Sequence, residues 1–440
     1  MAQASEISSA LPSSETSRFV VDEIHPQWAV EPADADEIGD LLRQARDRNW
    51  SLIPFGSGAR QGMGNPPRRF DIALSMRKFD RIPEYEPQDL VVKVESGCRL
   101  LDLQRKLAQD NLFLPIDPPW DSGTLGGIVA SNVSGPLRLA HGTIRDFLLG
   151  VGVVQPSGAK TKFGARVVKN VTGYDMCKLY AGSFGTLGVL TDFYFKLKPL
   201  PPCQATVLGV MKELSDVKTA LIKLRESPLS PLAVEFMNLE ARSVLDQMAS
   251  FARSHQGYSL IVLFGEVEGA VRWQVEELKR LWQPLGIVEF QLTDPAEQKA
   301  VWDALREDRP FFQGSSGSIV KLKINSLPSQ LTEVIRRLES LKSKLEGSLL
   351  IKSHAVNGVT RAYMNLSDSN QHQQEIINSI QHLRSFVKPF RGSVVIEMAP
   401  LALKKMIDVW GYDWGERSLM QRIREKYDPS TILNPGRFVV

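Results

Sequence analysis

Apolar and polar positions alternate most regularly between residues 192 and 198. Phe193, Phe195 and Leu197 fall on one side of an extended chain, and polar or charged residues stand between them. A period of two is typical of a strand with one buried face. We therefore predict a half-buried strand here, directly after a glycine-rich segment at 182–188.

The segment that begins at Asp34 has instead the period of an amphipathic helix. Its apolar positions follow the spacing i, i+3, i+4 and i+7 and are Ile38, Leu41, Leu42 and Ala45. Asp34 precedes them and Glu37 follows it three residues later, which is the pattern of a capping box. A helix is therefore predicted to begin after Asp34, with a short apolar run at 50–53 behind it.

In the second half of the chain, strand-like and helix-like patterns alternate. Strand-like runs lie at 205–210, 259–264, 319–324 and 348–353, and helical stripes lie at 271–282 and 331–341. Asn357-Gly358 separates two further strand-like runs and predicts a two-residue hairpin turn. Because hairpins pair strands antiparallel, we expect an α+β fold for residues 203–400, with the helices on one face of the sheet.

Glycine is concentrated in three loops, at 54–62, 122–135 and 182–188. In the first loop the glycines stand at 56, 58 and 62, which does not fit the G-x-G-x-x-G spacing of a Rossmann fold. Successive N–H groups of its Gly-Ser-Gly turn could still hold a pyrophosphate. In the second loop, Ser122 or Thr124 could cap a short helix whose N-terminus offers N–H donors to phosphate. Tightly packed turns without a ligand are the alternative for each loop, but three such loops in one chain favour a nucleotide cofactor.

Composition narrows the class of protein. Of 440 residues, 43% are apolar and 23% are charged, as in a soluble globular protein long enough for two domains. The net charge is +3 and no basic cluster is interleaved with aromatic residues, so nucleic-acid binding is not expected. No run of about 18 uncharged apolar residues is present, so no membrane span is expected. Residues 1–17 are rich in serine and alanine and indicate a disordered tail, not a signal peptide.

The three cysteines, Cys98, Cys177 and Cys203, are widely spaced and odd in number. They suit a reducing compartment and form neither an iron–sulfur pattern nor a zinc pattern. If electrons leave this chain through an iron–sulfur cluster, another chain must hold that cluster.

Four motifs in a fixed order carry a resemblance to a known family. They are Pro-x-Gly-x-Gly at 54–58, Thr-Leu-Gly-Gly-x-x-Ala-Ser-Asn at 124–132, Val-x-Gly-Tyr-Asp at 171–175, and Gly-Thr-Leu-Gly-Val-Leu-Thr at 185–191. In this order they resemble the FAD-binding domain of the vanillyl-alcohol oxidase / p-cresol methylhydroxylase superfamily. Within it, residues 169–175 and the closing Asn434-Pro435-Gly436-Arg437 most resemble the FAD-binding subunit of glycolate dehydrogenase (glycolate oxidase). The resemblance covers roughly residues 25–200 and 416–440.

The resemblance implies a division of the chain. We expect a disordered tail at 1–20, a two-part FAD-binding domain of the p-cresol methylhydroxylase type at 21–202, a substrate or cap α+β domain at 203–400, and a segment at 401–440 that returns to the FAD domain.

The resemblance also implies which residues hold FAD. Gly56, Ser57, Gly58, Ala59 and Arg60 would hold the pyrophosphate, mostly through main-chain N–H groups. Residues expected to line the flavin and ribityl region are Pro118, Thr124, Gly126, Gly127, Ala130, Ser131 and Asn132. Gly185, Gly188 and Val189 would approach the adenine or the flavin rim, and Asn434 would reach the cofactor from the C-terminal segment. A solvated Arg60 is the alternative for that side chain. Ala59 and Arg60 stand where some members carry a histidine, so we expect non-covalent FAD.

Catalytic residues are left unassigned by the sequence. Oxidation of a 2-hydroxy acid needs a cation for the carboxylate and a base near the hydroxyl. The His-x-His motif that the resemblance leads one to look for in the cap domain is absent. His354 and Glu397 are the placements we would test, against the alternatives of a framework histidine and a paired carboxylate.

Three functions remain open. The chain could be a subunit that oxidises glycolate or D-lactate and passes electrons through FAD to an iron–sulfur subunit. It could be a non-catalytic FAD-holding assembly or electron-relay subunit that supports a catalytic paralogue. It could also be a stand-alone dehydrogenase of another hydroxy acid or alcohol. A cytoplasmic location is expected, with peripheral membrane association through partners as the alternative.

Overall fold

The structure, a computed structural model, describes residues 9–119, 123–166, 173–248, 256–292, 294–308, 318–342, 347–366 and 373–438. The first long helix, α1 (Ala35–Arg48), begins where the sequence predicts. Asp34 Oδ1 accepts the main-chain N–H groups of Asp36 at 2.9 Å and of Glu37 at 3.0 Å, and the four predicted apolar side chains are buried. The capping box is incomplete, because the Glu37 carboxylate accepts the N–H of Ala33.

The described part of the N-terminal region contains a three-stranded sheet and a five-stranded sheet, besides one two-stranded pair. The smaller is parallel, with strand order β1 (Trp28–Val30), β3 (Ile72–Ser75) and β2 (Leu52–Phe55). The larger is antiparallel, with order β4 (Glu84–Glu86), β5 (Val91–Glu95), β9 (Val189–Lys196), β7 (Leu148–Val154) and β8 (Lys160–Gly164). The alternation predicted around Phe193 is confirmed, because Phe193, Phe195 and Leu197 are fully buried while the residues between them keep solvent exposure.

Short elements complete this region. They are α2 (Leu100–Ala108), β6 (Leu112–Phe113), α3 (Leu125–Ser131), α4 (Arg138–His141), α5 (Ile144–Phe147), α6 (Cys177–Tyr180), β10 (Lys198–Pro199) and the 3-10 turn η3 (Pro87–Asp89). Near the N-terminus, η2 (Ser13–Arg18) is a 3-10 helix and Phe19 is buried edge-on against Phe55. Residues 9–20 therefore differ from the disordered tail expected for 1–20, because Phe19 adds an aromatic ring to an apolar cluster that a serine-rich composition does not reveal.

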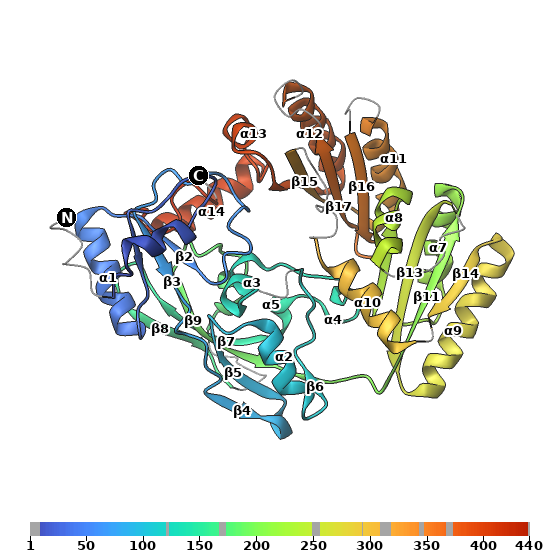
Figure 1. The fold of residues 1–440 in the computed structure, drawn as a ribbon, viewed down its shortest axis with the longest axis horizontal. Coiled ribbons are helices and arrows are strands. Elements are labelled where there is room, and N and C mark those ends of the chain that lie inside the picture. The colour runs from blue at the N-terminus through green and yellow to red at the C-terminus, as the bar shows by residue number, and fades with distance from the viewer. Residues whose placement is uncertain are drawn as a thin grey trace.

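The second region is one antiparallel sheet of eight strands. Their order is β14 (Val288–Leu292), β11 (Cys203–Met211), β13 (Tyr258–Glu266), β12 (Ala233–Met237), β16 (Gly347–His354), β17 (Val359–Leu366), β15 (Ser318–Asn325) and β18 (Ser393–Met398). In Figure 1 this sheet lies at the right and the N-terminal region at the left. The predicted α+β class with an antiparallel sheet is confirmed.

Helices cover both faces of the eight-stranded sheet, although the sequence analysis expects them on one. One face packs on α7 (Leu214–Glu226), α9 (Glu268–Trp282), α11 (Leu331–Lys342) and α12 (Gln373–Val387). On the opposite face, α8 (Leu239–Met248) and α10 (Pro295–Arg306) cover β11 and β13. The expectation fails because these two strands are apolar on both sides: Leu208 and Ile261 are as buried as Val207 and Val262. The short 3-10 turns η4 (Gln283–Leu285), η6 (Pro328–Gln330) and η7 (Lys388–Phe390) complete the region.

The hairpin between β16 and β17 is present, but its turn is longer than predicted. His354 pairs with Val359, so residues 355–358 form the loop. Of the pair Asn357-Gly358, only the glycine has a positive φ, +67°, whereas the predicted two-residue turn needs two such residues. Within this loop the Asn357 N–H donates to His354 O at 3.0 Å, while the Ala355 N–H still donates to Val234 O on β12 at 2.9 Å.

After β18 the chain returns to the N-terminal region through α13 (Leu401–Met406) and α14 (Trp414–Tyr427), as Figure 1 shows. Leu433 forms a parallel bridge with Leu52 at the edge of β2. Ile432 and Leu433 are fully buried there. Residues from both ends of the chain therefore complete the same small sheet. In the described part of the chain, no helix is long and apolar enough to cross a bilayer.

Candidate functional site

The first glycine loop follows β2 and leaves main-chain donors free. In the described structure, the N–H groups of Ser57, Gly58, Ala59 and Arg60 donate to no protein acceptor. Gly58 has a φ of +77°, a conformation that suits glycine and turns successive N–H groups to one side. Four adjacent donors without partners form a cradle for an anion such as a diphosphate.

Two other glycines let segments approach where a side chain would clash. A Cβ added to Gly56 would lie 2.0 Å from Thr124 Oγ1, and one added to Gly185 would lie 3.0 Å from Asn434 Nδ2. The first contact presses the glycine loop against the start of α3. The second presses the third glycine loop against the C-terminal segment.

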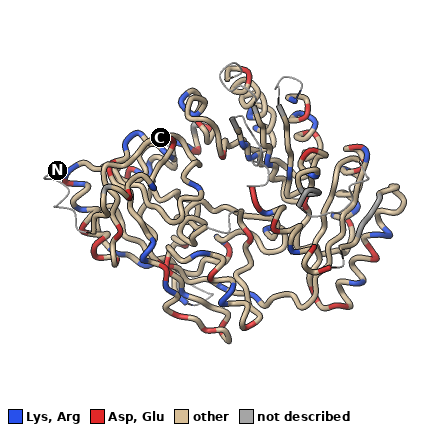
Figure 2. Tube along the Cα trace, in the orientation of Figure 1, with Lys and Arg blue, Asp and Glu red and all other residues tan. Residues whose placement is uncertain are grey.

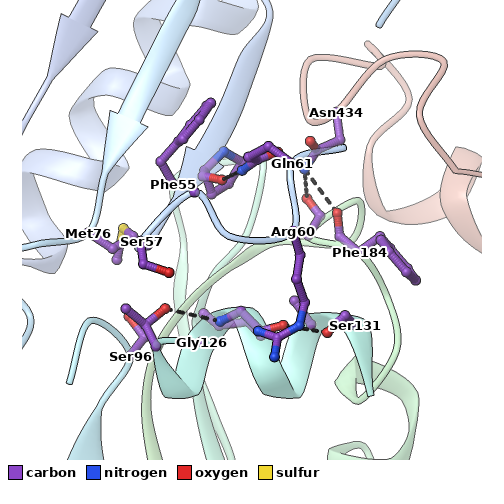
Figure 3. Close-up of a pocket in the computed structure, with 18 of the residues that line it drawn as sticks. Phe55, Ser57, Arg60, Gln61, Met76, Ser96, Gly126, Ser131, Phe184 and Asn434 are labelled. Carbon is purple, nitrogen blue, oxygen red and sulfur yellow. Dashed lines mark hydrogen bonds between the residues drawn. The ribbon is translucent and has the colours of Figure 1, made fainter. Parts of the chain in front are cut away.

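These contacts bring the predicted loops around one pocket (Figure 3). The predicted residues that line it are Gly56, Ser57, Gly58, Ala59, Arg60, Thr124, Gly126, Gly127, Ala130, Ser131, Gly185, Gly188, Val189 and Asn434. Pro118 and Asn132 do not line it. Asn132 instead ends α3 in the left-handed conformation, with a φ of 47°. Residues 120–122 and 169–172, which belong to the predicted motifs, lie outside the described residues.

The N-terminus of α3 does not offer the free donors that the sequence analysis expects. Thr124 caps the helix, but the N–H of Leu125 donates to Cys98 O at 2.9 Å and that of Gly126 to Ser96 O at 2.7 Å. The N–H of Gly127 donates to Thr124 Oγ1 at 3.4 Å. Protein acceptors therefore occupy this helix end, because the turn after β5 lies against it, and the anion cradle is the loop 57–60 alone.

Asn434 lines the pocket and also binds the third glycine loop, which forms part of the pocket wall. Its Nδ2 donates to Phe184 O at 3.0 Å and to Gly185 O at 3.2 Å. Both amide protons are thus used within the protein, and only Oδ1 is left for a ligand.

Several pocket residues escape prediction from the sequence. They are Phe55, Gln61, Met76, Ser96, Phe184, Leu190 and Arg437. Arg437 is the most informative, because its guanidinium is buried and donates to Gln61 O at 2.8 Å and to Met63 O, while Nη1 has no hydrogen-bond partner. The sequence does indicate Arg437 in one way, because it closes the Asn-Pro-Gly-Arg motif that begins with the predicted Asn434. Ser96 Oγ is likewise buried without a partner.

A cluster of charged and polar side chains lies on the other side of the pocket, on the eight-stranded sheet. On β15, Val320, Leu322 and Ile324 enter the apolar core, so Lys321 and Lys323 face the opposite way. We call this set the inner charged cluster: Glu235, Asp308, Lys321, Lys323, Lys352, His354, Arg361, Tyr363 and Glu397. In Figure 2 residues of both signs occupy the strands of the sheet that face the N-terminal region.

Two carboxylates of the cluster are ionised and paired. Lys321 Nζ lies 2.6 Å from Asp308 Oδ2 and 2.7 Å from Glu397 Oε2, and Tyr363 donates to Asp308 Oδ1 at 2.5 Å. Burial opposes ionisation, but nearby cations outweigh it. Lys321 and Lys352 hold the pKa of Asp308 well below its ordinary value, and Lys321 and Arg361 lower that of Glu397 to about 2. Glu397 is therefore the paired carboxylate that the sequence analysis gives as the alternative.

His354 is held on both ring nitrogens. Its Nδ1 lies 2.6 Å from Glu235 Oε1, and its Nε2 lies 2.8 Å from Arg361 Nη1. Because a guanidinium can only donate, Nε2 is the acceptor and Nδ1 carries the proton, so the ring is neutral. Burial and the charge of Arg361 lower the pKa of His354 well below its usual value. His354 thus has the framework role that the sequence analysis weighs against catalysis.

The cluster carries more positive than negative charge. Lys321, Lys323, Lys352 and Arg361 face the two ionised carboxylates, and burial raises the pKa of Glu235 well above its ordinary value, which favours the neutral acid. Burial lowers the pKa of both Lys323 and Lys352 to about 8, and the charges of Arg361 and Lys321 add to the effect. The cations repel one another, so an anion would be stabilised here.

Arg60 joins the pocket to the cluster. Its side chain leaves the glycine loop and extends over α3 toward Ser131 (Figure 3). Nη2 donates to Pro119 O at 2.5 Å, and Nε is buried without a hydrogen-bond partner. Burial lowers the pKa of Arg60 to about 10, whereas the negative charges of Asp308 and Glu397 oppose that effect. The guanidinium therefore remains charged and lies within electrostatic reach of the sheet.

These features fit a bound dinucleotide. The free N–H groups suit a diphosphate, and the clash that a Cβ would make at Gly56 explains why glycine is needed there. The unpartnered Ser96 Oγ and Arg437 Nη1 are further donors for a polar ligand. Among the described residues, no group of His, Cys, Asp and Glu has a metal-binding arrangement.

Two family models match the chain. One is described as "FAD binding domain" and matches residues 26–164, and the other as "FAD linked oxidases, C-terminal domain" and matches residues 200–438. The first model covers the first two glycine loops of the pocket, and the second covers the eight-stranded sheet with the returning segment that carries Asn434 and Arg437.

Curated relatives agree with these models. The chain is 24% identical to the glycolate oxidase subunit GlcD of Bacillus subtilis over 94% of this chain and 88% of that protein. It is 33% identical to the glycolate oxidase subunit GlcE of Escherichia coli, over 44% of this chain and 55% of that protein. It is 24% identical to a D-lactate dehydrogenase of Archaeoglobus fulgidus, over 99% of this chain and 98% of that protein.

The fold has solved counterparts. The crystal structure of p-cresol methylhydroxylase with substrate bound matches with a TM-score of 0.74 at 15% identity, over 97% of this chain and 93% of that chain. This likeness confirms the predicted p-cresol methylhydroxylase-type fold. Because the second family model spans more than half of the sequence, the chain belongs to the FAD-linked oxidases and is an FAD-binding oxidoreductase.

Proposed function

We propose that this chain oxidises a small 2-hydroxy acid, glycolate or D-lactate, at the contact between the FAD pocket and the inner charged cluster. The observation that carries the proposal is Arg60, a charged pocket residue within electrostatic reach of Asp308 and Glu397. It connects the cofactor site with a surface that has excess positive charge. The printed names of relatives, a glycolate oxidase subunit and a D-lactate dehydrogenase, support the choice of substrate class.

The residues divide the work as follows. The free N–H groups of Ser57–Arg60 would hold the FAD diphosphate. The guanidinium of Arg60, with Nε unpartnered, would bind the substrate carboxylate. Bound FAD supplies a two-electron acceptor for the hydride that leaves the hydroxyl-bearing carbon. The charges of the cluster, fixed before the substrate arrives, would keep the anion oriented in a water-poor site.

Electron transfer onward requires a partner in this proposal. The sequence has three widely spaced cysteines, and none of them supplies an iron–sulfur pattern. We therefore propose an iron–sulfur subunit and a catalytic paralogue as partners in a cytoplasmic complex. Non-covalent FAD remains part of the proposal.

An assembly role is the second candidate. It is favoured by His354, the histidine on the sheet nearest the site, because both its ring nitrogens are already engaged and it cannot act as a base. The partial match to GlcE, at 33% identity, is also compatible with a subunit that works beside a paralogue.

Anaerobic reduction of the bound flavin separates the two roles. The FAD-loaded chain is mixed with glycolate, D-lactate or L-lactate, and the flavin absorbance at about 450 nm is followed. Bleaching of the isolated chain by glycolate or D-lactate supports catalysis. Bleaching only after addition of partner subunits supports the assembly role, and no bleaching by any 2-hydroxy acid in either case would refute the proposed substrate class.

A further inference from the structure

The proposed reaction needs a proton acceptor, and most titratable groups of the inner charged cluster are occupied. His354 is bonded through both ring nitrogens. The Tyr363 hydroxyl donates to Asp308, and burial raises its pKa well above the ordinary value. Asp308 and Glu397 are ion-paired carboxylates with lowered pKa values, so both are weak bases.

Lys323 differs from these neighbours. In the described part of the chain no hydrogen bond or ion pair joins its ammonium group to the protein. Its neighbour on the same strand, Lys321, has two carboxylate partners. Lys323 also keeps partial solvent exposure, whereas Lys321, Arg361 and Glu397 are buried.

The strand register explains the isolation of Lys323. It stands directly across from Arg361 on β17, and Val395 stands across from it on β18. The β15–β18 pairing shifts between Lys321 and Leu322, and Glu397 approaches Lys321 to 2.7 Å. Lys323 is thus left beside a guanidinium, without a carboxylate in contact.

We propose that Lys323 is the catalytic base that takes the hydroxyl proton of the substrate. This inference rests on the proposed function. A neutral amine has the lone pair that the reaction needs. Burial favours that neutral form, and the cations Arg361, Arg138 and Lys321 add to the effect, while the charge of Glu397 opposes it.

The step balances as follows. The O–H bond of the 2-hydroxy acid breaks and its proton forms a new N–H bond on Lys323 Nζ. The C–H bond of the same carbon breaks, its electron pair leaves as hydride to FAD, and a C=O bond forms. The substrate is oxidised by two electrons to a 2-oxo acid and FAD is reduced by two. Lys323, now an ammonium, returns the proton to water, to which its side chain has access.

Two substitutions at Lys323 test the proposal. Lys323→Arg keeps the positive charge but cannot accept a proton at neutral pH. Lys323→Met removes both the charge and the proton acceptor. In the FAD-loaded protein, with partners if they are needed, both should slow flavin reduction by about 10²- to 10⁴-fold, as expected for loss of a general base. Lys405→Met, on the exposed surface of α13, is the matched control and should not change the rate.

The direction of the pH dependence distinguishes a base from an anchor. The groups that face Lys323 are Glu397 on β18, Arg361 on β17, Arg138 on α4 and Lys321 on β15, and burial with the three cations lowers its pKa to about 8. A base must be neutral, so kcat/KM should rise as the pH approaches about 8 and then level off. A lysine that only anchors the carboxylate must be charged, so kcat/KM would instead fall above that pH.

Asp117 is the rival base. Its pKa is raised to about 7 by burial, but both carboxylate oxygens accept the Leu137 N–H at 3.0 Å and so tie two segments together. Full activity of Lys323→Arg, or a kcat/KM that falls above pH 8, would overturn the proposal. Loss confined to Asp117→Asn would move the role to Asp117.

A measurement that does not depend on turnover keeps the two proposals separable. In NMR of lysine side chains labelled with carbon-13, the signal that disappears in Lys323→Arg should titrate near pH 8, separately from that of Lys352, whose pKa is also lowered to about 8. A Lys323 that titrates at the ordinary value would refute the inference even if hydroxy acids bleach the flavin. If no hydroxy acid bleaches the wild-type flavin, the proposed function fails, and the base assignment fails with it.

Discussion

At the scale of single residues, the contact between Gly56 and Thr124 decides whether the glycine loop can reach α3. We predict that Gly56→Ala weakens FAD binding at least about tenfold, because the new Cβ would lie 2.0 Å from Thr124 Oγ1 and force the loop away. FAD titration followed by flavin fluorescence measures the effect. Gly62→Ala is the matched control, since its Cβ would meet nothing within 4 Å.

The same contact supplies a second check. Thr124→Ala removes Oγ1 and Cγ2, two of the three Thr124 atoms that the Gly56→Ala methyl would meet, so the double variant should regain part of the lost FAD affinity. Equal FAD affinity of wild type and Gly56→Ala would show that the loop does not need this close approach.

Arg60 is expected to act on substrate more than on cofactor. Its main-chain N–H belongs to the anion cradle, whereas its side chain extends toward the inner charged cluster. We predict that Arg60→Met raises the KM for the hydroxy acid tenfold to a hundredfold, from the loss of a charge-assisted interaction of about 1.5–3 kcal/mol. FAD content should stay at the wild-type level. A loss of FAD with unchanged KM would assign the side chain to the diphosphate instead.

The sequence could predict this site residue by residue only where function lies in the backbone. Glycines at such positions can be identified from the sequence, because few other residues allow such close approach or a positive φ. They are Gly56, Gly58, Gly126 and Gly185. Phe184 carries no comparable signal, since a phenylalanine serves many purposes, and Arg437 is indicated only by its place in the Asn-Pro-Gly-Arg motif.

At the scale of elements, apolar and charged side chains alternate along the strands that carry the inner charged cluster. Each of the strands β15, β16 and β17 sends apolar side chains into one core and charged side chains to the other side. Within the inner charged cluster, Lys321 pairs with Asp308 and Glu397, so removal of the lysine leaves two buried carboxylates without this cation.

Lys321→Met tests that pairing. It leaves Asp308 and Glu397 buried with a cation removed, and we expect it to lower the free energy of unfolding by about 3–5 kcal/mol. Chemical denaturation followed by circular dichroism gives the value. The exposed Lys405→Met should change stability by no more than about 0.5 kcal/mol. Near-equal stability of the two variants would mean that the cluster is not held by ion pairs.

Elements were predictable where local pattern decides, as in α1 and β9. The helices α8 and α10 were assigned to the wrong face because the two-sided burial of β11 and β13 depends on neighbours far along the chain. The hairpin turn at 355–358 is longer than predicted, because Asn357 does not adopt the positive φ that a two-residue turn needs.

At the scale of the whole molecule, the site exists only when distant segments meet. Leu52 near the N-terminus bonds to residues 432 and 434 near the C-terminus, and Arg361 on the sheet donates to Ser134 O in the N-terminal region at 3.3 Å. Glu235 and His354, 119 positions apart, touch because β12 pairs with β16. No local pattern encodes such partners, which is why the cluster could not be read from the sequence.

The predicted non-covalent binding of FAD can be tested by denaturing the protein. No histidine lies in the glycine loop, so the cofactor should be held by packing and hydrogen bonds alone. Acid or heat denaturation is expected to leave a colourless precipitate and yellow FAD in the supernatant. Retention of the chromophore by the precipitate would contradict non-covalent binding.

The most direct test of the central claim is a crystal structure of the FAD-loaded protein with a bound 2-oxo acid such as glyoxylate or pyruvate. We predict that the ligand lies between the flavin and the inner charged cluster, with its carboxylate on Arg60 and its oxo group near Lys323 Nζ. A ligand bound away from both side chains would contradict the assignment of this contact as the active site.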